Sequence, residues 1–459
     1  MDSQDLSQNK MGVMPVGKLL FTMSLPMIVS MLIQALYNVV DSVFVNMIST
    51  EAFDAVSIAF PVQNLMIGVA TGTGVGVNAL LSKALGEKDR ERANRIAENG
   101  VFLALLGYLV FLVFGIFFAR PFFNLYAAKV TPATIEYGVT YISICSIFSL
   151  GVFGQIMFER LMQSTGKTLF TLFTQGIGAI VNIIFDPIMI FGLCGFPKMG
   201  VAGAAIATVL GQFVAFFLAF FFNHKYNHDV RLSLRRFRPN GEIIGRIYSI
   251  GVPSIIMVGI GSIMTFSMNQ ILGTLKQTAI TVFGAYFKIQ SFIFMPVFGL
   301  NNGVIPIIAF NYGAGKRGRM MKTIKLAIIT ACCFMILGFA VMQLFPDKLL
   351  GILVTENSPA DLLTTGVPAL RTISFSFLLA GICIALGSVF QALGHGFLSM
   401  LVSIARQLLV LIPVAYLFSL SGNVELVWWA FPIAELASAA VSAGGFVYLY
   451  KKIIRQIPE

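Results

Sequence analysis

Two acidic residues stand out because each lies within a long apolar stretch of the sequence. Asp41 comes near the end of the first stretch, and Asp186 lies in the fifth, one helical turn after Asn182. Ionisable side chains at membrane depth are costly and are usually kept for function. Pro187 cannot donate a hydrogen bond to the carbonyl of Ile183, which leaves a free acceptor near Asp186. A carboxylate, an amide and a free carbonyl are hard oxygen ligands, which suit a proton or a small cation such as sodium.

A polar stripe leads up to Asp41 along the same predicted helix. Gln34, Tyr37 and Asn38 precede Asp41 by seven, four and three residues, so the four side chains share one face. The stripe either seals this helix against its neighbours by hydrogen bonds or contributes to a substrate site. We expect it to bind substrate beside the acidic residue.

The chain is too apolar for an ordinary soluble protein. Hydrophobic residues make up 57% of it and charged residues 11%. Membrane-length apolar stretches predict spanning helices, which satisfy their own backbone hydrogen bonds, so we expect an all-α membrane protein and no barrel. The twelve predicted spans are 16–40, 54–82, 97–119, 135–158, 168–192, 200–222, 243–272, 279–309, 323–345, 362–388, 397–419 and 425–449.

The sequence repeats itself at an offset of 227 residues. Pro26 then falls on Pro253, and Gln63 falls on Gln290. Glycine is common here, with 43 of 459 residues, so only several glycine pairs along one diagonal carry weight. Duplicated membrane segments are typical of transporters whose pathway lies between two lobes. We expect lobes at 1–223 and 243–459, joined by a linker at 224–242. The glycine pairs are Gly72 with Gly299, Gly76 with Gly303 and Gly86 with Gly313.

The formal net charge of +11 reflects membrane orientation, and we do not expect a nucleic-acid partner. Most Lys and Arg residues cluster at 83–95, 225–246, 316–325 and 451–455, on the side that holds both termini in the predicted topology. This positive-inside pattern predicts cytoplasmic termini in a plasma membrane, with the basic linker resting on anionic headgroups. The linker carries His224, Lys225, Arg231, Arg235, Arg236 and Arg238, and the opposite side carries Arg120, Lys129, Lys198, Lys276 and Lys348.

Few residues could support enzyme chemistry or a cofactor. The five Cys and three His have no metal-type spacing, so we expect no disulfide framework, no zinc site and no cofactor. Short basic loops at 81–90 and 308–317 contain glycine but lack the phosphate-loop pattern. We interpret Gly86 there as the left-handed cap of a helix. Glycines within the spans are interpreted as sites of close helix packing.

Several segments follow a pattern shared by one transporter family. These are Leu25-Pro26-Met27-Ile28, residues 34–41, Ala59-Phe60-Pro61, Ala84-Leu85-Gly86, residues 200–208 and Asn311-Tyr312-Gly313. They resemble the multidrug and toxic compound extrusion (MATE) family, in particular its bacterial drug-efflux branch, over nearly the whole chain. The resemblance implies two pseudo-symmetric six-helix lobes and a cation site at Asp41, Asn182 and Asp186 in the N-terminal lobe. It also implies a hydroxyl from the sixth span, for which Thr208 is the best match.

The C-terminal lobe lacks these acidic residues, because Met268 and Val414 stand opposite Asp41 and Asp186 in the repeat. We therefore expect ion coupling in the N-terminal lobe. Glu435 is open to either a substrate role or structural pairing. Glu159 with Arg160, and also Lys288 and Arg406, are interpreted as structural pairs or as side chains reaching an interface. Aromatic and thioether side chains near two glutamines suit varied flat cations, and these candidate substrate residues are Gln63, Met66, Phe287, Gln290, Phe294 and Met295.

These features predict a monomeric secondary antiporter that exports amphipathic organic cations in exchange for protons. Sodium is the alternative coupling ion. A flippase for lipid-linked or polysaccharide headgroups is the second hypothesis, although its cavity should be richer in Arg and Lys. A membrane enzyme is the third, and no His, Cys or Ser constellation favours it.

Overall fold

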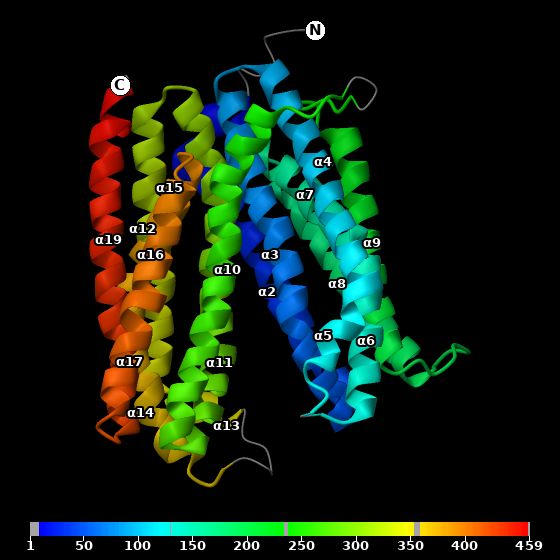
Figure 1. Ribbon diagram of the computed structural model, residues 1–459. Helices are drawn as coiled ribbons and strands as arrows, with labels where there is room; N and C mark the ends of the chain where they lie inside the picture. Colours follow the sequence, from blue (N-terminus) through cyan, green and yellow to red (C-terminus); the bar gives the residue numbers. More distant parts are fainter. Residues whose placement is uncertain (1–8, 129, 234–236, 353–358, 458–459) are drawn as a thin grey trace.

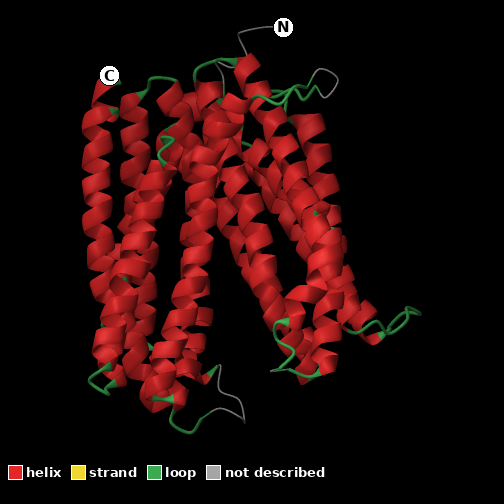
Figure 2. Cartoon of the chain, in the orientation of Figure 1, coloured by secondary structure: helices red, strands yellow, loops and turns green. Residues whose placement is uncertain are grey.

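The computed structural model describes residues 9–128, 130–233, 237–352 and 359–457, and these residues form helices and connecting loops (Figure 2). Lys129, Arg235 and Arg236, used above to predict orientation, lie outside them. Ten helical segments in the described ranges are long and apolar enough to cross a membrane, and two bent pairs of shorter helices raise the number to twelve. The prediction of an all-α protein is confirmed, and the ten to twelve membrane-length segments agree with the twelve predicted spans.

The N-terminal lobe comprises α1 to α9. A π-helical turn, η2, joins α4 to α5 within one long apolar segment. Helices α6 and α7 meet at a bend of 44° and are together long and apolar enough to make one span. The elements are α1 (Lys10–Val13), α2 (Val16–Asn46), α3 (Thr50–Gly86), α4 (Arg90–Val113), η2 (Phe114–Phe118), α5 (Ala119–Asn124), α6 (Pro132–Ile147), α7 (Leu150–Ser164), α8 (Thr168–Phe191) and α9 (Val201–Tyr226).

The C-terminal lobe comprises α10 to α19 and repeats this plan. Helices α14 and α15 meet at a bend of 50°, and the π-helix η4 lies between α16 and α17. The elements are α10 (Gly241–Leu275), α11 (Gln277–Gly313), α12 (Arg317–Leu344), α13 (Pro346–Gly351), α14 (Leu362–Ser374), α15 (Phe377–Ala392), α16 (Gly396–Ser403), η4 (Ile404–Leu411), α17 (Ile412–Ser419), α18 (Val424–Trp428), α19 (Ala430–Lys452) and η5 (Ile454–Gln456).

The two lobes touch through their first two long helices. Helix α2 packs on α11, and α3 packs on both α10 and α11. The N- and C-termini lie at the same end of the molecule, and the helices of the two lobes diverge toward the opposite end (Figure 1). The backbones of the two lobes therefore pack closely in the half that holds the termini.

Repeat-related glycines make this contact possible. A Cβ atom on Gly86 would lie 2.0 Å from the carbonyl oxygen of Phe310, and one on Gly313 would lie 2.1 Å from that of Lys83. Real Cβ atoms do not approach other atoms so closely, so backbone meets backbone here. We call Gly72, Gly76 and Gly86 of α3 together with Gly299, Gly303 and Gly313 of α11 the glycine seam.

The prediction that Gly86 is a left-handed helix cap is wrong. Gly86 ends α3 in helical conformation, and the residue with positive φ is Lys88, at 62°. The equivalent residue in the second lobe is Gly315, at 67°. Close packing therefore accounts for Gly86 and Gly313, and the turn occurs two residues later.

The short helix α1 bridges the lobes at the end that holds the termini. Arg319 donates to the carbonyl oxygens of Met11 and Met14 at 3.1 and 2.6 Å, and Lys316 donates to that of Gly12 at 2.8 Å. Met11 is fully buried. On the other side, the Asn9 amide lies 3.5 Å from the carbonyl oxygen of Thr165 in the N-terminal lobe.

The described part of the linker lies against α4, and its residues 227–233 and 237–240 are not helical. The backbone N–H groups of Arg231 and Ser233 donate to Asn94 and Glu98 at 2.8 and 2.9 Å. Helix α9 continues to Tyr226, so the first part of the predicted linker is helical. The lobe limits at residues 223 and 243 stay predictions.

Candidate functional site

Asp41 and Asp186 meet inside the N-terminal lobe. Asp41 lies on α2 and Asp186 on α8, and their carboxyl groups lie close enough to interact. Asp186 is fully buried, and Oδ1 of Asp41 is buried without a donor. Helix α8 continues through Pro187 to Phe191, so Asp186 is held within a regular helix.

Polar side chains from three helices surround the two acidic residues. Asn182 lies one turn before Asp186, and its side chain reaches both Asp186 and Thr208. In the amide orientation that satisfies both ends, its nitrogen donates to Asp186 Oδ2 at 3.1 Å and its oxygen accepts from the Thr208 N–H at 3.2 Å. The Tyr37 hydroxyl contacts the Thr208 side chain. We call Tyr37, Asp41, Asn182, Asp186 and Thr208 the acid cluster.

The two carboxyl groups of the acid cluster repel each other when both are ionised. Two like charges 4 Å apart repel by about 4 kcal/mol at an effective dielectric constant of 20. No Lys or Arg pairs with either carboxylate in the described chain. A proton shared between the carboxyl groups, or a small cation bound by them, removes this repulsion. The oxygen atoms of the cluster therefore suit either a proton or a small cation.

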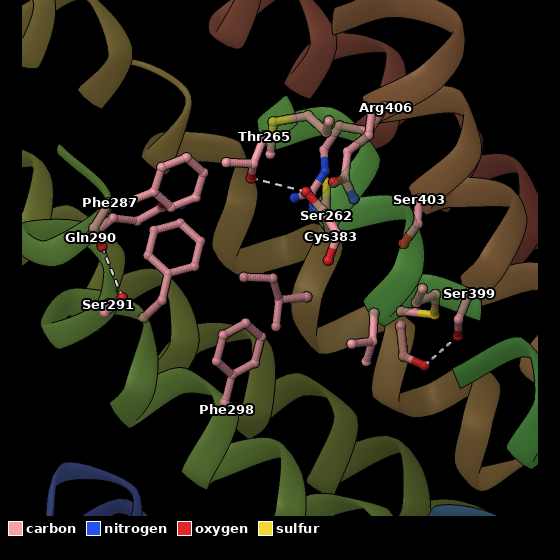
Figure 3. Close-up of a pocket in the computed structure, with 18 of the residues that line it drawn as sticks. Ser262, Thr265, Phe287, Gln290, Ser291, Phe298, Cys383, Ser399, Ser403 and Arg406 are labelled. Carbon is pink, nitrogen blue, oxygen red and sulfur yellow. Dashed lines mark hydrogen bonds between the residues drawn. The ribbon is translucent and has the colours of Figure 1, made fainter. Parts of the chain in front are cut away.

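A large cavity lies between the lobes where they diverge. Its volume is about 1070 Å³, and α2, α3 and α7 line one side. Most of the wall comes from the C-terminal lobe, from α10, α11, α15, α16, η4 and α19. Figure 3 shows hydroxyl groups, phenyl rings and one guanidinium group around this space. A cavity of this size and mixed character suits an amphipathic organic molecule.

The structure divides the predicted substrate residues into two groups. Five of them line the cavity, namely Phe287, Gln290, Phe294, Met295 and Glu435. The remaining candidates do not line it: Tyr37 belongs to the acid cluster, Gln63 lies 3.4 Å from the Tyr141 hydroxyl, Met66 is buried in the core, Asn38 is exposed, and Gln34 is partly buried.

The predicted pair between Glu159 and Arg160 is not present. Glu159 accepts hydrogen bonds from Thr174 and Gln175 at 2.7 and 2.8 Å, whereas Arg160 donates across the lobes to Asn302 at 2.9 Å. Adjacent residues in a helix point in different directions, so a pair at this spacing was unfavourable from the start. Arg160 is 7% exposed and lines the inner end of the cavity.

Arg406 does form an ion pair, with Glu435. The distance from Arg406 Nη1 to Glu435 Oε2 is 3.5 Å. Lys288 is exposed on the outside of α11 and forms no ion pair within the described ranges. Sequence reasoning missed that Arg160 and Arg406 both line the cavity. Their position within apolar spans was the available signal, but the direction of each side chain was not readable.

Two pseudo-symmetric helical lobes around a central cavity, with a partly buried pair of acidic residues in one lobe, are typical of a membrane transporter. A family model described as MatE matches residues 26–188 and 253–417. The chain belongs to this family, as predicted from sequence, and is therefore a transporter and not an enzyme.

Two curated relatives extend over nearly the whole chain. The multidrug export protein MepA of Staphylococcus aureus is 26% identical over 441 residues, which cover 95% of this chain and 94% of that protein. A protein named FAD transporter, from Shewanella oneidensis, is 26% identical over 434 residues, which cover 92% of each chain.

Solved structures share the fold. A multidrug resistance MATE family transporter in an outward-facing conformation superposes with a TM-score of 0.88 at 24% identity, covering 99% of this chain and 98% of that one. A MATE protein in the straight conformation also gives 0.88 at 24% identity, with 99% of both chains covered.

Proposed function

We propose that this protein is a secondary antiporter that exports amphipathic organic compounds, including organic cations, in exchange for protons. The observation that carries the proposal is the proximity of Asp41 and Asp186 within a cluster in which Asp186, Asn182 and Thr208 are buried and Asp41 is partly buried. Binding of one proton relieves the repulsion between the carboxylates, and its loss restores it. Sodium is the alternative coupling ion, because the same oxygen atoms are suitable ligands.

The position of the acid cluster supports coupling through lobe movement. None of its five residues lines the central cavity, so ion and substrate do not share ligands in this state. Asp41 lies on α2, and α2 packs directly on α11 of the other lobe. A change in the charge of the cluster therefore acts on a helix that belongs to the contact between lobes, and the lobes would then rock as near-rigid bodies.

The cavity supports an amphipathic substrate. Tyr286, Phe287, Phe294, Phe298 and Phe431 line it together with serine, threonine and amide side chains. Aromatic faces attract flat and cationic molecules, and the hydroxyl groups supply adaptable hydrogen bonds. The relative named as a multidrug export protein supports the same class of cargo.

We further propose that the protein acts as a monomer in the plasma membrane with both termini in the cytoplasm. The basic clusters at the end that holds the termini support this orientation. In that orientation the divergent end of the molecule faces outward.

Exchange of one proton for one monovalent cation moves no net charge, so each unit of pH difference supplies about 1.4 kcal/mol of driving force.

The decisive experiment follows ethidium efflux from proteoliposomes under an imposed pH gradient without sodium. We expect Asp41→Asn to lower pH-driven efflux at least tenfold, because an amide cannot exchange a proton. Asp54→Asn is the matched control, since Asp54 is an exposed acid on α3 outside the cluster. Unchanged efflux by Asp41→Asn would remove the cluster from the mechanism. Efflux that follows only a sodium gradient would establish the alternative ion, and movement of a lipid-linked headgroup in place of the dye would favour a flippase.

A further inference from the structure

The charged residues that line the cavity do not match a site for cations alone. They are Arg160, Arg406 and Glu435, so the described wall carries one more positive than negative charge. Arg160 is already engaged, because it donates to Gln163 and Asn302, each at 2.9 Å. Among the residues that the structure describes, Arg406 has one hydrogen bond, the 3.5 Å contact with Glu435. That distance is at the outer limit for a hydrogen bond, so most of the guanidinium's five donors remain available.

Arg406 is the accessible member of its ion pair. Its side chain is 29% exposed, whereas that of Glu435 is 6% exposed. Figure 3 shows Arg406 reaching into the pocket toward Ser262 and Cys383. A soluble ligand therefore meets the guanidinium group before the carboxylate.

Glu435 lines the same cavity as Arg406, and its hydrogen bonds are incomplete. Glu435 Oε1 and the hydroxyl oxygens of Ser438 and Ser442 are buried without hydrogen-bond partners. These three residues lie on one face of α19, and the Cys383 side chain of α15 contacts all of them. The Glu435 carboxylate thus offsets the charge of Arg406 but leaves most N–H groups of the guanidinium unoccupied. Arg406 can therefore bind a second anionic group.

The surroundings of Arg406 are built for a group with polar and flat parts. Arg406 lies in the π-helix η4, and such turns occur often at functional sites. Ser262, Thr265 and Ser403 offer hydroxyl groups beside it, and Phe287 lines the same cavity (Figure 3). An aromatic ring against the phenyl wall therefore lies within the same space as an anion on the guanidinium.

We propose that Arg406 is an oxyanion subsite, which binds a carboxylate or phosphate group of an amphipathic aromatic substrate. This inference rests on the proposed export function and extends its substrates to compounds that also carry an anionic group, including zwitterions. The planar guanidinium fork matches the two oxygens of a carboxylate or phosphate. A relative named as an FAD transporter is compatible with such a group.

The test compares matched dyes on the purified full-length protein in nanodiscs. Rhodamine 110 carries a free carboxyl group, and rhodamine 123 is its methyl ester. Their dissociation constants are measured by fluorescence polarisation at neutral pH. We expect Arg406→Gln to raise the dissociation constant of the free acid, relative to that of the ester, about tenfold. This change corresponds to the loss of a charge-assisted hydrogen bond. Riboflavin and riboflavin 5′-phosphate form the second pair and report whether phosphate is also bound.

Three further variants separate recognition from a structural role. Arg406→Lys keeps the charge without the fork and should give an intermediate ratio. Glu435→Gln removes a competing carboxylate and should tighten binding of the free acid. Arg371→Gln removes an exposed positive charge that does not line the cavity, and it should not shift the ratio.

The outcomes that overturn the inference are distinct from failure of the proposed function. Equal weakening of acid and ester by both Arg406→Gln and Glu435→Gln would mean that the pair is only structural. A wild-type protein that binds the ester but neither anionic dye would also overturn the subsite. Absence of pH-driven efflux of ethidium and of every dye would instead overturn the proposed transport function.

Discussion

Substitution of Gly313 by alanine tests whether close backbone contact holds the lobes together. The new Cβ atom would lie 2.1 Å from the Lys83 carbonyl oxygen, whereas ordinary contacts begin near 3.4 Å. The two helices must therefore separate locally by about 1.3 Å. Overpacking of this kind costs about 1–3 kcal/mol. Because the contact exists only where the lobes are closed, the same energy shifts their equilibrium about 5- to 150-fold toward separation at that end.

The assay is a distance measurement between spin labels on the two lobes. Labels at Glu91 of α4 and Lys322 of α12, on a cysteine-free background, report the separation at the end that holds the termini. We expect Gly313→Ala to move the distance distribution toward longer values. Gly284→Ala on the same helix is the control, since nothing lies within 4 Å of its Cβ position. Gly284→Ala should leave the distance distribution unchanged and should stabilise α11 by up to about 1 kcal/mol, because alanine has a higher helix propensity than glycine.

The reasoning would be refuted if Gly313→Ala kept the wild-type distance distribution and the wild-type melting temperature. Such a result would mean that the seam yields by small backbone shifts without energetic consequence. A change of equal size in Gly284→Ala would also refute it, because the effect would then not depend on the contact with Lys83.

Three further outcomes are expected. Asn302→Leu should lower the melting temperature, because it removes a partner of buried Arg160 and costs about 1–3 kcal/mol; no change would mean that Gln163 alone suffices. Arg319→Ala should raise proteolytic cleavage before residue 15, since it removes two hydrogen bonds to α1; wild-type resistance would contradict this. Hydrogen bonds from Lys276 and Thr278 lower the pKa of Asp361 from its ordinary value of 3.8. The ionised Asp361 therefore stabilises the fold above that ordinary pKa, and this stabilisation is lost as the pH falls through the lowered pKa. The melting temperature of Asp361→Asn should therefore be lower than wild type at pH 7, and the gap should narrow below about pH 4; a gap that is constant with pH would exclude this ion pair as its cause.

The helices were predictable because hydropathy and the repeat both follow directly from the chain. The breaks within two spans were harder to predict, because neither contains proline or glycine at the bend. Helix α6 ends before Phe148-Ser149, and α14 ends before Phe375-Ser376. These identical dipeptides are related by the repeat offset of 227, so the internal comparison held a signal that hydropathy lacked.

The acid cluster was predictable in its acidic members, because a carboxylate is costly within a membrane wherever its helix is placed. Which other residues join it depends on helix rotation. Tyr37 turns toward Thr208, whereas Asn38, one residue later, is exposed. The charge of the cavity was not predictable for the same reason, since the directions of Arg160 and Arg406 depend on packing between helices distant in sequence.

Helix α1 belongs to one lobe by its place in the sequence and to the other by its contacts. It precedes α2 and so belongs to the first half of the chain, yet four hydrogen bonds from Asn311, Lys316 and Arg319 attach it to the second half. Within the described residues, its side-chain hydrogen bonds with the first half are long, at 3.5 Å from the Asn9 amide to the Thr165 carbonyl oxygen and 3.8 Å from the Thr22 hydroxyl to the Met14 sulfur. When the halves rotate, we expect α1 to travel with α11 and α12, so the bending falls on Met14 and Pro15. Helix α1 and the residues that join it to α2 would then tether the N-terminal lobe to the C-terminal lobe. The length of this connection would limit how far the two lobes can rotate apart.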